Sequence, residues 1–165
     1  MRRGTYLGLA AAGIAAAAVL AYSLILARAG SDGSGAGGLT FLGEPVAAAS
    51  IAAGREIYAS TCAACHGANL EGQPDWQRRL ENGRMPAPPH DETGHSWHHS
   101  DRNLFVLTKG GIGAVVPGYE SDMPAFGGIL SDEEIAAVLA YIKSTWPERQ
   151  RAFQAEVTAN DRGEP

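Results

Sequence analysis

The longest apolar stretch of the chain lies at its N-terminus. Leu7 to Ala27 form an uncharged run of 21 residues that follows the basic start Met1-Arg2-Arg3. A bilayer-spanning helix needs about 20 apolar residues, whereas the apolar core of a signal peptide has about 7–15. Residues 1–28 are therefore predicted to be a single-pass transmembrane anchor, with the two arginines on the cytoplasmic side.

Two other interpretations of this run remain open. Ala27-Arg28-Ala29 resembles an A-x-A cleavage site, so the segment could instead be a signal peptide that is removed. A buried helix of a soluble fold is the third possibility. Under the first two, the rest of the chain is exported. It is then expected in the bacterial periplasm, either tethered to the cytoplasmic membrane or soluble.

Glycine and serine dominate the next stretch. Gly30 to Gly38 read "GSDGSGAGG" and show no apolar periodicity. Such a composition is typical of a flexible linker. Residues 29–49 are predicted to be that linker.

Helical periodicity is clearest near the C-terminus. Apolar residues recur at helical spacing at Ile135, Val138, Leu139, Ile142 and Trp146. Ser131 and Glu134 precede them in the arrangement of a capping box, and Pro147 follows them. This pattern predicts a helix from about residue 131 to 146. The stretch 147–165 is predicted to begin as a further helix, because proline suits a first helical turn, and to end as a polar tail.

A second helix is predicted near Asp101 to Lys109. Ser100 or Asp101 can cap its start, and Gly110-Gly111 can end it. Leu104, Phe105 and Leu107 are expected to face the core.

Charge narrows the range of partners. The chain has 13 Lys and Arg against 18 Asp and Glu. Without Arg2, Arg3 and Arg28, ten basic residues remain, so the exported part has a net charge near −8. The sequence contains no basic stripe of the kind that binds nucleic acid, and a nucleic-acid partner is not expected.

Both cysteines of the chain lie in the stretch Cys62-Ala-Ala-Cys65-His66. A disulfide between them would be strained, and a thioredoxin-like redox pair would need a neighbouring βαβ pattern that the sequence lacks. Zinc is possible, because four more histidines follow. Covalent haem is favoured. Two thiols on one helical turn can reach the two vinyl groups of one porphyrin edge, and the next residue then places its imidazole under the iron.

The sequence also resembles the class I (mitochondrial-type) cytochromes c, in particular small bacterial monohaem forms, over residues 50–146. The resemblance rests on three blocks, "GREIYASTCAACHG", "MPAF" and "LSDEEIAAVLAYIKS". It implies an all-α fold wrapped around one covalent haem c, with Cys62 and Cys65 as thioethers and His66 as the proximal ligand. It also implies that the first and last helices cross at Gly54, with Tyr58 and Tyr141 beside the crossing.

Two methionines are candidates for the distal iron ligand. Met85 and Met123 are both followed by proline, which stiffens a ligand loop. In the family that the sequence resembles, the distal ligand belongs to a Met-Pro loop just before the last helix. The resemblance therefore implies Met123.

A histidine-rich loop, "PPHDETGHSWHH", precedes the helix at 101–109. The simpler interpretation is a polar loop packed at the haem edge, with Trp97 or Trp76 covering a propionate. The alternative is a second metal site, with copper as the candidate metal, built from His90, His95, His98 and His99.

These observations predict a one-electron carrier, not an enzyme. His/Met ligation leaves no open position at the iron and favours electron transfer. The partners would be other redox proteins, whose identity the sequence does not indicate. Two alternatives stay open, namely a haem subunit of a larger oxidase or dehydrogenase and a copper-handling protein that uses the histidine-rich loop.

Overall fold

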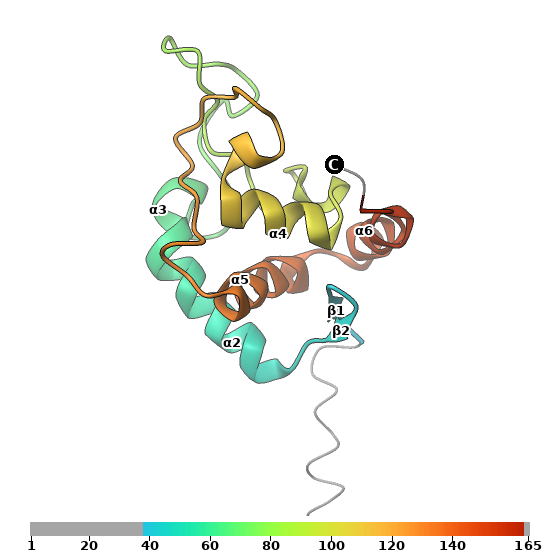
Figure 1. The fold of residues 1–165 in the computed structure, drawn as a ribbon. Helices are drawn as coiled ribbons and strands as arrows, with labels where there is room; N and C mark the ends of the chain where they lie inside the picture. The colour runs from blue at the N-terminus through green and yellow to red at the C-terminus, as the bar shows by residue number, and fades with distance from the viewer. Residues whose placement is uncertain (1–37, 164–165) are drawn as a thin grey trace, which may run out of the picture.

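The structure is a computed structural model that describes residues 38–163. Those residues are mostly helical, as predicted, with one small hairpin (Figure 1). In chain order the elements are β1 (Thr40–Phe41), β2 (Glu44–Pro45), α2 (Ala48–Ile57), the π-helix η1 (Tyr58–Cys62), α3 (Ala63–His66), the 3-10 helix η2 (Ser96–His98), α4 (Asp101–Gly110), the 3-10 helix η3 (Ile112–Ala114), α5 (Asp132–Thr145) and α6 (Glu148–Asn160).

Helix α5 forms the centre of the core. Its predicted capping box is present, because Ser131 Oγ accepts from the Glu134 amide and the Glu134 carboxylate accepts from the Ser131 amide. The five apolar residues that predicted this helix are all buried. Helix α4 likewise begins after Ser100, whose hydroxyl accepts a hydrogen bond from the amide of Asn103.

Helices α2 and α5 cross where the resemblance implied. A Cβ atom added to Gly54 would lie 2.0 Å from the backbone oxygen of Ala137, so only glycine allows this approach. Beside the crossing, the rings of Tyr58 and Tyr141 pack with centroids 5.6 Å apart. The crossing fixes the direction in which the chain runs from α2 into η1 and α3.

The segment before α2 differs from the prediction. Residues 39–46 form the antiparallel hairpin β1–β2, and Leu39, Phe41 and Val46 are buried in the core. Leu42 and Gly43 both have positive φ, the geometry that favours tight two-residue hairpins. The flexible-linker prediction therefore does not hold for residues 39–46.

The predicted transmembrane segment lies outside the described residues. Within residues 38–163, no helix is both long and apolar enough to cross a membrane.

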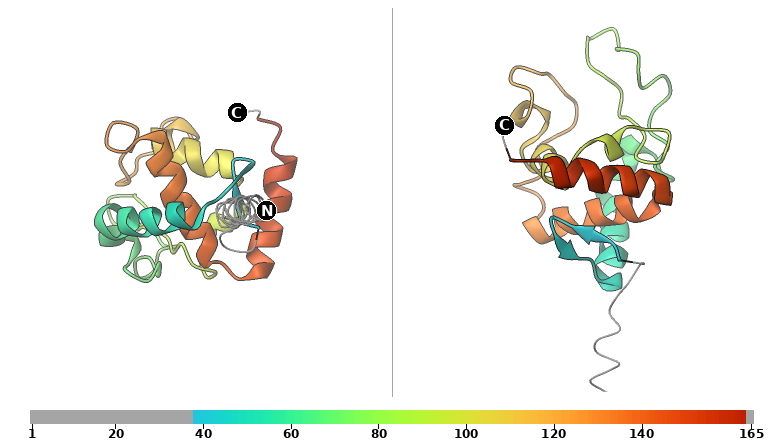
Figure 2. Two further views of the ribbon diagram at one scale, coloured as in Figure 1. Left: turned by 90° about the horizontal axis from the view of Figure 1, so that it is seen from below. Right: turned by 90° about the vertical axis from the view of Figure 1, so that its right-hand side faces the viewer.

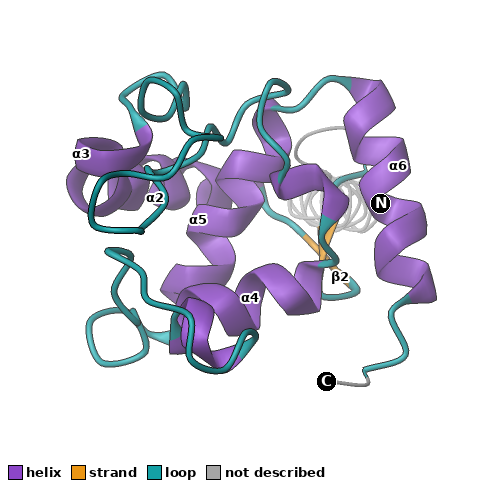
Figure 3. Cartoon of the chain, turned by 90° about the horizontal axis from the view of Figure 1, so that it is seen from above, coloured by secondary structure: helices purple, strands orange, loops and turns teal. Residues whose placement is uncertain are grey.

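Helix α6 begins directly after Pro147, as predicted for this stretch. It lies on the opposite side of α5 from α2 and α3 (Figure 2, Figure 3). Gln154 of α6 is completely buried, and its amide nitrogen donates to a carboxylate oxygen of Asp101 and to the carbonyl of His99. The helix is therefore attached to the start of α4 and to the loop that precedes it.

Candidate functional site

The two cysteines and His66 lie at the end of one continuous helical run, α2–η1–α3. Cys62 ends the π-helix, while Cys65 and His66 belong to the single turn of α3. A π-helical turn widens the helix and is common at functional sites. Neither thiol is in a disulfide, and both cysteines lie beside His66 at the end of this helical run.

The His66 ring has a defined orientation and protonation state. Its Nδ1 atom lies 2.9 Å from the carbonyl oxygen of Pro88. A carbonyl oxygen can only accept, so Nδ1 carries the proton and Nε2 keeps its lone pair. Burial also lowers the pKa of His66, despite the opposing effect of this hydrogen bond. His66 is thus held as a neutral imidazole with one nitrogen free to bind a metal.

Tyr58 forms hydrogen bonds to the end of this helical run. Its hydroxyl donates to the carbonyl of Gly67 at 2.8 Å and lies 3.3 Å from the carbonyl of His66. These carbonyls belong to the end of a helix, where backbone acceptors lack intrahelical partners. Burial raises the pKa of Tyr58 well above its usual range. The phenol therefore stays protonated and keeps donating at neutral pH.

The environment of Cys62 argues against thiol redox chemistry. Burial, together with the neighbouring Cys65, raises the pKa of the Cys62 thiol to about 11. Redox-active cysteines in Cys-x-x-Cys motifs have lowered pKa values instead. Within residues 38–163 the two strands form one short hairpin, and no βαβ unit is present.

The four histidines of the loop do not converge on one point. The His90 ring stacks on His66 with centroids 4.0 Å apart, whereas His95 stacks on Trp76. His98 packs on Trp97, and His99 meets the His95 ring edge-on. Among residues 38–163, no three His, Cys, Asp or Glu side chains are grouped as a metal site. The geometry therefore does not assemble the second metal site, or the zinc site, that the sequence left open.

Of the two candidate methionines, Met123 is the one that packs against the hydrophobic core. Its side chain is half-buried, and its amide donates to the Ser121 hydroxyl. Met85 is half-buried but is not part of that core. An ion pair between Arg84 and Asp122 joins the loops that carry the two methionines.

Several residues fit a bound haem. Cys62, Trp97, Leu104, Phe105 and Met123 all pack at the edge of the same core. The indole nitrogen of Trp97 is buried and has no hydrogen-bond partner among the described residues. A buried donor without a partner is costly, and a propionate of a bound haem is a group that could accept from it. The expectation for Trp97 stays a prediction, whereas Trp76 is engaged with His95.

Two supports of the site could not be read from the sequence. Pro88 provides the carbonyl that orients His66 from 22 residues away. Trp146, at the end of α5, donates its indole N–H to the carbonyl of His90 at 2.7 Å. Both contacts depend on the path of a long loop that has no periodicity.

The comparison with known proteins decides the family. The Cytochrome c family model matches residues 51–146, which is more than half of the chain. The chain belongs to the cytochrome c family. It is also 34% identical over 101 residues to cytochrome c6 of Picosynechococcus sp. (strain ATCC 27264 / PCC 7002 / PR-6), a match that covers 61% of this chain and 77% of that protein. No solved structure matches the chain.

Family membership establishes the cofactor and the general role. The chain carries covalently bound haem c, and the Cys-x-x-Cys-His motif with Cys62 and Cys65 is consistent with its attachment. It is a haem-based electron-transfer protein.

Proposed function

We propose that His66 and Met123 bind the haem iron on opposite faces and that the chain passes single electrons between other redox proteins. The observation that carries this proposal is the 2.9 Å contact between His66 Nδ1 and the Pro88 carbonyl, because it leaves Nε2 as the metal-binding nitrogen. When bound, the haem supplies a one-electron Fe(II)/Fe(III) couple.

The roles of the protein side chains follow from their surroundings. Cys62 and Cys65 hold the porphyrin through thioethers, which fixes it against the α3 turn. Pro88 keeps the His66 ring oriented and makes it a better donor through the shared hydrogen bond. Met123 supplies a thioether that favours the reduced iron. His66 and Met123 together would leave no position on the iron for a substrate, which supports a carrier rather than an enzyme.

The location of the carrier is a second part of the proposal. The apolar run Leu7–Ala27 supports a single-pass anchor in a bacterial cytoplasmic membrane, with the haem domain in the periplasm. The partners are redox proteins that have access to the periplasmic side of this membrane.

A redox titration followed by absorbance tests the proposed function. We expect one reversible transition with the slope of a single electron and no binding of carbon monoxide by the reduced protein. Ready binding of carbon monoxide would show an open iron position, and that result would favour ligand or substrate chemistry over electron transfer.

A further inference from the structure

The imidazole of His90 lies flat against the imidazole of His66. The ring centroids are 4.0 Å apart and the planes differ by 23°. We propose that His90 is a positioning residue that fixes the plane of the His66 ring about the bond from Nε2 to the iron. This inference rests on the proposed role of His66 as the axial ligand, and it gives His90 a role other than the metal ligand that the sequence suggested.

The hydrogen bond to Pro88 does not fix the ring by itself. Hydrogen bonds tolerate tens of degrees of misalignment before they weaken strongly, so the single N–H···O contact that sets the direction of Nδ1 still allows the imidazole plane to rock about it. A flat group stacked on one face restricts that rocking, because rotation would drive the two rings into each other. His90 supplies this flat group, and the rings of His90 and Tyr58 meet in a T-shaped arrangement with centroids 6.4 Å apart.

A positioning residue must itself be held, and His90 is held at three points. Its Nδ1 atom lies 2.8 Å from the hydroxyl of the buried Ser96. Its carbonyl accepts from the Trp146 indole, and its amide donates to the carbonyl of Leu70 at 2.7 Å. Trp146 is 1% exposed. The backbone of His90 is therefore tied to the end of α5, and its ring is tied to the buried Ser96.

The plane of an axial imidazole has measurable consequences. Its π orbital overlaps with one of the iron d orbitals, and the orientation of the ring decides which one. In the ferric state that choice sets the g values in electron paramagnetic resonance and the order of the four haem methyl signals in proton NMR. Groups behind a metal-binding histidine are known to orient such ligands.

The test compares three variants of the full-length haem protein with a control. His90→Leu removes the flat ring, His90→Phe restores a flat ring without the polar atoms, and Ser96→Ala removes only the hydrogen bond to His90. His95→Leu is the matched control, because His95 is an exposed histidine of the same loop that stacks on Trp76 instead. The readouts are the ferric g values and the haem methyl shifts.

We expect His90→Leu to shift and broaden the largest g value and to change the spread of the methyl signals. Ser96→Ala should shift in the same direction as His90→Leu by a smaller amount. His90→Phe keeps a flat ring but also loses the hydrogen bond to Ser96, so its shift should be about as small as that of Ser96→Ala, and His95→Leu should match the wild type. Wild-type spectra for His90→Leu would overturn the proposal. If His90→Leu does not accumulate, the other two variants decide. The proposal would be overturned if Ser96→Ala had the g values and methyl shifts of the wild type. It would also be overturned if the spectra of His90→Phe differed from the wild type clearly more than those of Ser96→Ala.

The wild-type protein separates this inference from the proposed function. Failure of the proposed function would appear there, as a ferric spectrum without the low-spin signal of two strong axial ligands. Failure of the His90 inference leaves that wild-type signal intact and appears in the variants alone.

Discussion

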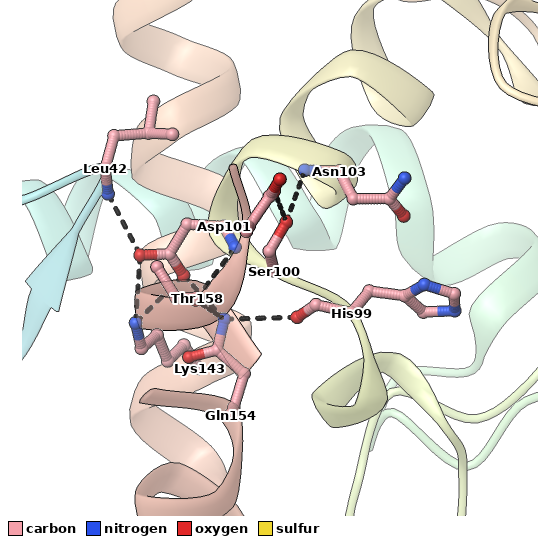
Figure 4. Close-up of polar contacts among 9 residues, drawn as sticks. Leu42, His99, Ser100, Asp101, Asn103, Lys143, Gln154 and Thr158 are labelled. Carbon is pink, nitrogen blue, oxygen red and sulfur yellow. Dashed lines mark hydrogen bonds and ion pairs between the residues drawn. The ribbon is translucent and has the colours of Figure 1, made fainter. Parts of the chain in front are cut away.

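The Lys143 ammonium lies 2.9 Å from the carboxylate of Asp101, and both side chains are buried (Figure 4). The same carboxylate accepts from the amide nitrogen of Gln154 at 2.7 Å and from the backbone amide of Leu42 at 3.0 Å. One carboxylate therefore joins α4, α5, α6 and the β1–β2 hairpin. Its position in the first turn of α4 also suits a negative charge, because the helix dipole is positive there.

Removing one member of this pair should destabilise the domain strongly. Lys143→Met leaves the Asp101 carboxylate buried without its cation, which costs about 3 kcal/mol or more in the free energy of unfolding. Lys109→Met is the matched control, because the Lys109–Asp132 pair is exposed and is worth about 1 kcal/mol or less. Urea unfolding followed by circular dichroism measures both. Equal losses for the two variants would contradict the role of Asp101 as a shared anchor.

Tyr58 gives the stability of the domain a dependence on alkaline pH. The folded state raises the pKa of Tyr58 above its unfolded value of about 10. Its contribution to stability is therefore complete below pH 10 and is lost as the pH rises toward the folded pKa. Tyr58→Phe should be less stable than the wild type at neutral pH by about 1 kcal/mol, through its lost hydrogen bonds.

The difference between Tyr58→Phe and the wild type should shrink above pH 10, because the wild type alone must keep this phenol protonated. Unfolding free energies at a series of pH values test this. A difference that stays constant, or grows, from neutral to alkaline pH would show that Tyr58 is not the group responsible.

The anchor prediction concerns residues outside the described part of the chain. If Leu7–Ala27 is retained, the mature protein begins at or near Met1 and stays with the membranes after a high-salt wash. N-terminal sequencing and fractionation give the answer together. A soluble protein that begins at Gly30 would show that the segment is a cleaved signal instead.

The sequence predicted best where the signal is local and repeated. Ser131 and Glu134 marked the start of α5, and the apolar spacing after them matched the buried face of that helix. Gly54 was placed at a helix crossing by the family resemblance, and the cost of about 1 kcal/mol for a glycine within a helix agrees with a packing role there. In both cases a short local block of sequence carries the signal.

The hairpin β1–β2 was missed for a physical reason. Each strand has two residues, too few for any alternation to show, and Leu42 takes a left-handed conformation that is unusual for leucine. The composition of the preceding glycine-rich stretch therefore dominated the prediction. Burial of Leu39, Phe41 and Val46 arises from contact with helices far along the chain, which local composition cannot reveal.

For the histidine-rich loop, the composition suggested more than the structure shows. Its composition suggested a metal site, but the role of each ring is set by distant partners. The His90 ring stacks on His66, and the His90 backbone accepts a hydrogen bond from Trp146, which lies 56 residues further along the chain. No pattern within the loop distinguishes His90 from His95.

The two methionines offer the most direct test of the account. A methionine sulfur on ferric haem gives a weak near-infrared charge-transfer band and favours the reduced state. We predict that Met123→Ala removes this band, lowers the reduction potential and opens the iron to cyanide or carbon monoxide. Met85→Ala should keep the band and the potential, with at most a modest loss of stability from a smaller side chain. A band that survives Met123→Ala and disappears in Met85→Ala would contradict the ligand assignment.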